Sequence, residues 1–313
     1  MTNHATELGA VNQNPQHLFD CWSQVAERVR SADRLALFLD FDGTLASFRT
    51  RPEEVTLSDS TRRVLTRLGC HLQVRLFILS GRRLADLENR VGVPGLCYFG
   101  LHGWEGPNTA TPKATARRVL HRVKRQVELE LAGLRGVWIE EKGPILAVHV
   151  RGAAPHAVRR AGDIVGRVTK AFEPHLRVLP GNKVWEVMPQ ELEGKGAAVR
   201  ALLREMPAGT LPVYVGDDTT DESAFAVLRH GITVCAGPRP TKAKFQVRGP
   251  REVRRFLEKV ERELREIKPI STSDSSPLRI CHPSATRSRT TSRSSGRGNL
   301  SLPQPFSTMT LPR

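Results

Sequence analysis

The sequence has no long apolar run, few aromatic residues and no paired-cysteine motif. No segment approaches the roughly 18 apolar residues that a membrane helix needs, and the polar N-terminal stretch lacks the apolar centre of a signal peptide. We therefore expect a cytoplasmic protein with no membrane partner. The five cysteines show no CxxC spacing, which argues against a disulfide framework and against a structural zinc site. With aromatic residues at 5%, the predicted core is mainly aliphatic.

Acidic residues are scarce relative to basic ones, since 32 Asp and Glu face 48 Lys and Arg and leave a net charge of +16. Such an excess raises nucleic acid as a partner. However, residues 269–313 hold six Arg and one Asp among 17 Ser or Thr, and this composition buries too little apolar surface to fold. The other basic residues lie on helical patterns such as 116–126 without interleaved aromatics. We favour solvated faces over binding of a polyanion or of a small anionic substrate, and predict a disordered basic tail at 269–313.

Short apolar runs alternate with helical patterns in the first third of the chain. The runs at 35–41, 74–79 and 96–99 predict buried strands, with helices at 58–68 and 84–90 between them. The same alternation returns after residue 195 and ends in an amphipathic helix at 251–267. This order predicts an α/β fold with a doubly wound parallel sheet, in which ligands bind at the carboxyl ends of the strands.

The middle of the chain follows a different rhythm. Two helices, each followed by a pair of strands, are expected at 113–134, 137–141, 145–150, 156–172, 176–179 and 184–188. Paired strands with helices on one side describe an α+β layer. We therefore predict a core made of 19–107 and 190–268, an inserted α+β cap domain at 108–189, and a disordered N-terminal tail at 1–18.

Two acidic clusters follow apolar strands of the predicted core. Asp40 and Asp42 belong to DFDGT after the first strand, and Asp217, Asp218 and Asp221 belong to GDDTTDE after a later one. An isolated DxDG is more often an ordinary turn, but two such clusters converge if both strands end at one edge of the sheet. Carboxylates held that close need a hard cation such as Mg²⁺.

Two further groups fit a phosphate ligand. Ser80 and Arg82 lie in the SGR sequence that ends the second strand, where a hydroxyl and backbone N–H groups approach a helix start. Lys195 stands between two glycines at the start of a later helix. A lone lysine of this kind is usually only solvated, but its place between the serine and the second acidic cluster favours a common site.

LFLDFDGTL, ILSGR, the glycine-flanked Lys195 and GDDTTDE resemble the four motifs of the haloacid dehalogenase-type (HAD) phosphatases. The resemblance implies that Asp40 is the nucleophile and that Asp42 protonates the leaving group and later activates water. It implies that Mg²⁺ is held by Asp40, the main-chain carbonyl of Asp42 and Asp217. Ser80 and Lys195 would hold the phosphoryl oxygens, with Asp218 and Asp221 supporting the metal site from behind.

Segments of the insertion narrow the resemblance to the trehalose-6-phosphate phosphatases. These segments contain GLHG at 100–103, EEKG at 140–143, HVR at 149–151 and GNKVWEVMP at 181–189. The resemblance implies a sugar phosphate substrate, supplied by a separate trehalose-6-phosphate synthase because the chain is too short to add a synthase domain. It assigns substrate binding to Arg82, His102, Glu140, Lys142 and Glu186.

The insertion also departs from the family pattern at two positions. Asn182 stands where the family usually has Lys, with Lys183 one place later, so a sugar contact from Lys183 is open. Val150 replaces a common aromatic residue. Two alternatives stay beside trehalose 6-phosphate hydrolysis: a phosphatase of the same superfamily acting on sucrose phosphate or a mannosyl phosphate, and a basic anion-binding regulatory protein without catalysis.

Overall fold

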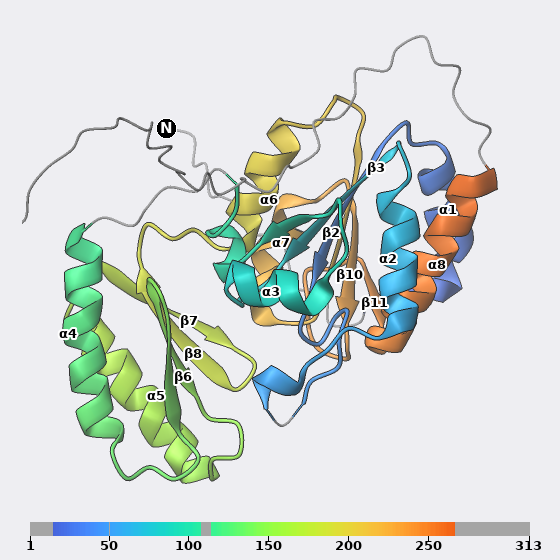
Figure 1. Ribbon diagram of the computed structural model, residues 1–313. Helices are drawn as coiled ribbons and strands as arrows, with labels where there is room; N and C mark the ends of the chain where they lie inside the picture. The colour runs from blue at the N-terminus through green and yellow to red at the C-terminus, as the bar shows by residue number, and fades with distance from the viewer. Residues whose placement is uncertain (1–14, 50, 108–113, 267–313) are drawn as a thin grey trace, which may run out of the picture. The chain divides into compact units, whose positions relative to one another are not determined.

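The computed structural model describes residues 15–49, 51–107 and 114–266 (Figure 1). They form two sheets, one parallel and one antiparallel, each covered by helices. None of the described helices combines the length and the apolar composition that crossing a bilayer requires. The predicted tail at 269–313 and most of the predicted tail at 1–18 lie outside the described residues.

The parallel sheet has the strand order β1-β11-β10-β9-β2-β3-β4. Its centre consists of β9 and β2, whose residues are almost wholly buried because helices cover both faces. The seven strands, in chain order, are β1 (Gln16–His17), β2 (Leu35–Asp40), β3 (Val74–Leu79), β4 (Cys97–Phe99), β9 (Leu211–Gly216), β10 (Ile232–Ala236) and β11 (Phe245–Val247).

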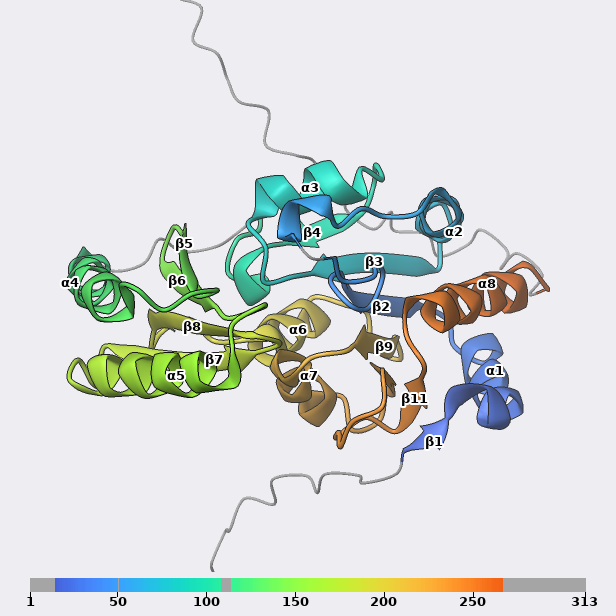
Figure 2. The same ribbon diagram turned by 90° about the horizontal axis from the view of Figure 1, so that it is seen from below.

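Successive side chains of β2 point to opposite faces of the parallel sheet and so divide the core into two layers. Figure 2 shows helices on both sides of this sheet. Leu37 and its like-facing neighbours join the cluster that contains helices α1 (Trp22–Arg30), α2 (Asp59–Gly69), α3 (Leu84–Val91) and α8 (Pro250–Glu266). Phe38 faces the other way, into the cluster with α6 (Lys195–Arg204) and α7 (Glu222–Val227). This is the predicted doubly wound α/β arrangement, so the fold class is confirmed.

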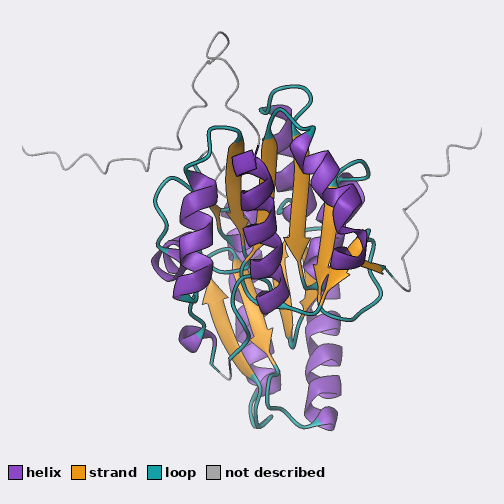
Figure 3. Ribbon diagram, turned by 90° about the vertical axis from the view of Figure 1, so that its right-hand side faces the viewer, coloured by secondary structure: helices purple, strands orange, loops and turns teal. Residues whose placement is uncertain are grey.

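The antiparallel sheet has four strands in the order β5-β6-β8-β7, and all four fall within the predicted insertion. They are β5 (Trp138–Lys142), β6 (Ile145–His149), β7 (Leu176–Gly181) and β8 (Val184–Pro189). Helices α4 (Ala114–Leu131) and α5 (Pro155–Lys170) pack through aliphatic side chains on one face. The other face carries polar side chains at alternate positions. Figure 3 shows the strands of both sheets in orange, with the helices in purple.

Short 3-10 helices complete the described chain at Leu18–Cys21, Pro52–Glu54, Leu101–Gly103 and Thr219–Asp221. The N-terminal boundary differs from the expectation of a disordered segment 1–18. Gln16 and His17 pair with β11, and Leu18 is fully buried in the core. A two-residue edge strand carries no periodic signal, so the sequence pattern did not indicate it. Strand β11, which lies between β1 and β10, was missed because its three residues are also too few to show a periodic pattern.

Candidate active site

Adjacent strands β2 and β9 bring the two acidic clusters together at one edge of the parallel sheet. Asp40 is the last residue of β2, and Asp217 follows the last residue of β9. Lys195, the first residue of α6, reaches the same point: its Nζ lies 2.6 Å from Oδ1 of Asp40. Asp40 and Lys195 are both buried. The predicted meeting of Asp40, Asp217 and Lys195 is therefore present in the geometry.

Asp221 has no exposed surface and is held in place by three hydrogen bonds from protein donors. Its Oδ1 accepts hydrogen bonds from Nζ of Lys195 at 2.7 Å and from the hydroxyl of Tyr214 at 2.7 Å. Its Oδ2 accepts the backbone N–H of Asp218 at 2.9 Å. Since its acceptor positions are occupied by protein donors, Asp221 orients Lys195.

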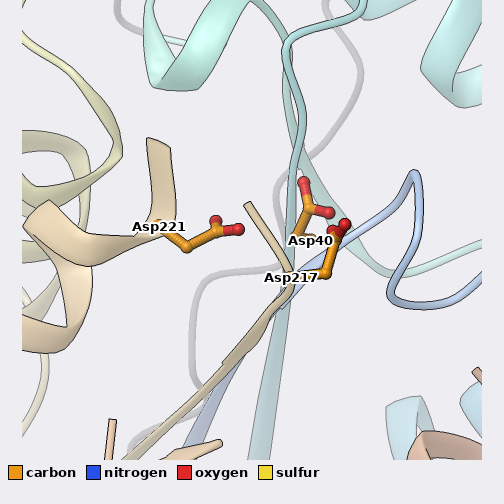
Figure 4. A group of neighbouring side chains, drawn as sticks. All are labelled: Asp40, Asp217 and Asp221. Atoms are coloured by element: carbon orange, nitrogen blue, oxygen red, sulfur yellow. The ribbon is translucent and has the colours of Figure 1, made fainter. Parts of the chain in front are cut away.

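Carboxylate oxygens of Asp40, Asp217 and Asp221 lie within 4.8 Å of one another (Figure 4). Burial, followed by the charges of the neighbouring carboxylates, raises the pKa of Asp217. Burial likewise raises the pKa of Asp40, against the lowering effect of Lys195. One lysine does not balance three neighbouring carboxylates, of which two are buried and that of Asp217 is half-buried, so the cluster has the chemistry of a hard-cation site. Asp40 and Asp217 are the members with oxygens left for such an ion, and the donor set fits Mg²⁺.

Gly43 permits the close approach of the two loops. It adopts φ +85°, and a Cβ at this position would lie 2.2 Å from Oδ2 of Asp217. A side chain here would push Asp217 away from the site. Thr44, the next residue, donates its hydroxyl to Oδ1 of Asp217 at 3.1 Å. Thr44 belongs to the DFDGT motif, but its role depends on β9 and could not be read from the motif alone.

Arg82 is paired with Asp42. Its Nε and Nη2 contact the two carboxylate oxygens of Asp42 at 2.7 Å each, and Nη1 contacts Asp86 at 2.8 Å. Burial favours the neutral guanidinium, but the hydrogen bonds and charges of both carboxylates raise the pKa of Arg82. With its donors engaged in this way, Arg82 holds the Asp42 side chain, whereas the resemblance assigned it to substrate.

The SGR loop after β3 is tied to the segment Leu101–Gly103. Leu101 and His102 have φ of +47° and +60°, which are strained values for residues other than glycine. The backbone N–H of His102 donates to the carbonyl of Ser80 at 2.8 Å, and that of Leu101 donates to Arg82. The imidazole of His102 lies over Gly81, where a Cβ would meet it at 2.8 Å. The strained turn thus places His102 beside the buried Ser80.

A second cluster of ionisable groups joins this loop to the antiparallel sheet. Glu186 of β8 is 4% exposed, and its Oε2 lies 2.5 Å from Nε2 of His102. Lys142 of β5 donates to Oε1 of Glu186 at 3.0 Å and to the carbonyl of Gly81 at 3.5 Å. Burial raises the pKa of Glu186, but the interactions with His102 and Lys142 outweigh it and lower the pKa far below its usual range. Nδ1 of His102 is buried without a hydrogen-bond partner among the described residues.

Glu140 lies two residues before Lys142 on the same face of β5. Its Oε2 accepts from Nε2 of His149 at 2.9 Å and lies 3.8 Å from Nζ of Lys142. Burial opposes ionisation, yet these contacts lower the pKa of Glu140. The structure therefore brings Glu140, Lys142 and Glu186 together, as the sequence reasoning expected, and adds His149.

Two contacts connect the β7–β8 hairpin with the acidic loop after β9. Oδ2 of Asp218 accepts the backbone N–H of Asn182 at 3.1 Å, and the Thr219 hydroxyl donates to the carbonyl of Pro180 at 2.9 Å. The resemblance placed Asp218 behind the metal, whereas its side chain contacts the hairpin. Lys183, with φ +61°, is at the hairpin tip.

Sequence reasoning missed Tyr214 and Arg239. Tyr214 is the buried hydroxyl donor to Asp221, and burial raises its pKa. Arg239 donates from Nε to the carbonyl of Asp217 and from Nη2 to that of Asp218, both at 2.7 Å. A tyrosine in an otherwise apolar strand was the available signal for the first. The second offered none, because its contacts form only after β10 returns the chain to this edge.

One cavity of about 480 Å³ links the two clusters. Its lining includes Asp40, Asp42, Ser80 and Lys195 at one end and the four ionisable groups of the antiparallel sheet at the other: Glu140, Lys142, His149 and Glu186. Val150 is buried among the aliphatic residues beneath this sheet, so that departure from the family pattern does not reach the cavity. Asn182 and Lys183 line it.

The family model described as trehalose-phosphatase matches residues 38–251. The trehalose-phosphate phosphatase of Mycobacterium tuberculosis is 35% identical over 248 residues, which are 74% of this chain. The chain spans 62% of the length of that relative. The C-terminal domain of a C. albicans trehalose-6-phosphate phosphatase has a TM-score of 0.69 at 23% identity, covering 80% of this chain and 99% of that one. An Aspergillus fumigatus trehalose-6-phosphate phosphatase has a TM-score of 0.53 at 25% identity, covering 77% and 97%.

Proposed function

Since the chain belongs to the trehalose-phosphatase family, we propose that it hydrolyses trehalose 6-phosphate to trehalose and phosphate with the help of Mg²⁺. The observation that carries the proposal is the shared cavity. A buried carboxylate and lysine lie at one end, and charged groups suited to sugar hydroxyls lie at the other. A substrate with one phosphate and many hydroxyls matches both ends. A separate synthase would supply it.

Asp40 attacks the phosphorus atom through a carboxylate oxygen, and the bond between phosphorus and the sugar oxygen breaks. Lys195 fixes the rotation of Asp40 through Oδ1 and places a positive charge beside the transferring group. That lysine donates a hydrogen bond to Asp221, and the hydroxyl of Tyr214 donates to the same carboxylate oxygen, so Asp221 holds the lysine in place. Ser80, buried at the same end of the cavity, donates its hydroxyl to a phosphoryl oxygen.

Asp42 transfers the protons. It protonates the leaving sugar alkoxide and then takes a proton from the water that attacks the aspartyl-phosphate, which releases phosphate and restores Asp40. The bidentate contact with Arg82, which is itself held by Asp86, fixes the orientation of the ionised carboxylate. This is the form of Asp42 that takes the proton from water in the second transfer.

Asp40, Asp217 and the main-chain carbonyl of Asp42 would hold Mg²⁺. When bound, the ion offsets the charge on the phosphoryl oxygens and on the carboxylates. The chain prepares this position by fixing the loop after β9: Arg239 holds two of its carbonyls and Thr44 holds the carboxylate of Asp217.

Glu140, Lys142 and Glu186 bind sugar hydroxyls. Each lies on the cavity wall. A sugar hydroxyl can donate a hydrogen bond to either carboxylate or accept one from the ammonium group of the lysine. A phosphate ester without matching hydroxyls does not form these additional hydrogen bonds, so it binds more weakly and the site is selective. His102 acts indirectly in sugar binding, because its contact with Glu186 holds that carboxylate in position.

The test is phosphate release from a panel of trehalose 6-phosphate, sucrose 6-phosphate, mannosyl phosphates and glucose 6-phosphate, with Mg²⁺ and with a chelator. We expect the highest kcat/KM for trehalose 6-phosphate and loss of turnover on chelation, restored by added Mg²⁺. Preference for another sugar phosphate would replace the substrate while keeping the reaction. No release from any ester would favour a regulatory, non-catalytic role.

A further inference from the structure

The wall of the cavity carries two exposed aromatic rings. Among the described residues, four large hydrophobic side chains are exposed: Phe48, Leu72, Leu129 and Trp138. Both aromatic ones line the cavity, whereas the two leucines do not. An exposed aromatic ring in a pocket lined by many charged side chains is characteristic of a surface that contacts a ligand.

Trp138 is held in one orientation by its neighbours. Its indole stacks on the imidazole of His149, with ring centroids 3.8 Å apart and planes 11° from parallel. Nε2 of His149 is in turn bound to Oε2 of Glu140 at 2.9 Å. Trp138 itself is 43% exposed, so the imidazole supports one face of the indole while much of the ring stays open. A ring fixed in this way loses little side-chain entropy when a ligand packs on it.

Trp138 and Lys142 are the first and last residues of β5, so they lie beside different parts of the cavity. Trp138, Glu140 and Lys142 alternate along the strand and so share one face. Four residue steps along the strand lead from the first to the last, a length of about 13 Å. Lys142 contacts the carbonyl of Gly81 beside the phosphate end of the site. Trp138 therefore lies at the end of the row farther from the phosphate.

We infer that Trp138, supported by His149, is the platform on which the second sugar ring of a disaccharide phosphate packs. This inference rests on the proposed function and adds the residue that distinguishes a disaccharide from a monosaccharide phosphate. A pyranose presents C–H groups on one face and hydroxyls at its edge. The indole covers the C–H face, and Glu140 is placed to bind an edge hydroxyl.

The decisive experiment compares Trp138→Ala with the wild type on three substrates: trehalose 6-phosphate, glucose 6-phosphate and a small aryl phosphate. We expect kcat/KM for trehalose 6-phosphate to fall about tenfold, chiefly through KM, which corresponds to about 1.4 kcal/mol. The values for the two smaller esters should stay within about twofold. Trp138→Phe keeps an aromatic face and should recover most of the loss. Leu129→Ala, which truncates an exposed side chain outside the cavity, is the matched control and should change none of the three.

Fluorescence supplies a readout that is independent of turnover. Titration with trehalose, which lacks the phosphate, should change the tryptophan emission of the wild type, and Trp138→Phe should abolish that change. Equal losses on all three esters, or an unchanged KM for trehalose 6-phosphate in Trp138→Ala, would overturn the inference while leaving the proposed function intact. Failure of the wild type to hydrolyse trehalose 6-phosphate would instead overturn the proposed function.

Discussion

Two clusters of largely buried ionisable groups lie among the described residues, and they are assembled differently. The first, with Asp40, Lys195 and Asp221, comes from elements of the parallel sheet and its helices alone. The second joins His102, from a loop beside that sheet, to Lys142 and Glu186 of the antiparallel sheet. The first cluster is complete within the part of the fold that surrounds the parallel sheet. The second forms only where this part meets the antiparallel sheet, so the proposed sugar recognition depends on that contact and the proposed chemical step does not.

The largest effect should come from the nucleophile. Asp40→Asn keeps the size of the side chain and removes the attacking charge, so phosphate release should fall by more than about 1,000-fold on every ester. The Asn variant also removes one of three crowded carboxylates, so its melting temperature should not fall greatly. Phosphate release and thermal unfolding measure the two effects. Asp163→Asn, an exposed change on α5, is the control, and a folded Asp40→Asn with substantial turnover would refute the role.

Replacing the lysine of each cluster should lower the free energy of unfolding by different amounts. Lys195→Met leaves Asp40 and Asp221 as buried charges without their partner, which should cost about 3–5 kcal/mol and nearly all activity. Lys142→Met leaves Glu186 in contact with His102 and should cost less. Denaturant unfolding of both variants tests this order. If Lys142→Met proved the more destabilising, the second cluster would be the main electrostatic support of the fold.

Glu186→Gln should affect substrates unequally. We expect a loss of roughly tenfold to a few hundredfold on trehalose 6-phosphate, the scale of one or two hydrogen bonds to a charged group, with an aryl phosphate spared. Glu141→Gln, on the opposite face of β5, is the matched control. Equal losses on both esters would place Glu186 in the support of the fold or of the metal site.

The same variant has a pH signature in stability. The folded pKa of Glu186 lies below its unfolded value of 4.5, so the ionised group stabilises the protein above that pH. This contribution declines as the pH falls below 4.5 toward the folded pKa. The gap in melting temperature between wild type and Glu186→Gln should therefore be greatest near pH 7 and shrink below about pH 4. A gap independent of pH would show that packing, and not charge, is lost.

The smallest effect should come from the contact between the β7–β8 hairpin and the acidic loop after β9. Thr219→Val removes the hydroxyl that binds the carbonyl of Pro180 and should lower kcat/KM for trehalose 6-phosphate by about two- to fivefold. The aryl phosphate should be unaffected, and Thr219→Ser should behave as the wild type. An equal loss on the aryl ester would mean that the contact shapes the acidic loop and not the cap hairpin.

Strand and helix patterns indicated most of the fold because each depends on neighbouring residues. The run VRLFIL gave β3 with its bounds, and the stripe from Val253 to Leu264 gave α8. The short strands β1 and β11, of two and three residues, were not indicated. Their stability comes from pairing with distant strands, which leaves no local periodicity to detect.

Local patterns along the chain identify the charged residues that follow strands or begin helices, and these patterns predict that Asp40, Asp217 and Lys195 meet. The hydrogen-bond partner of each side chain depends on the folded structure. Folding directed Arg82 to Asp42, Asp218 to the backbone of Asn182, and Tyr214 to Asp221. It also stacked Trp138 on His149. Strand and helix patterns depend on residues that are close in sequence. A buried charged group, in contrast, must pair with whatever polar group folding brings within hydrogen-bonding distance, and that group can come from any part of the chain.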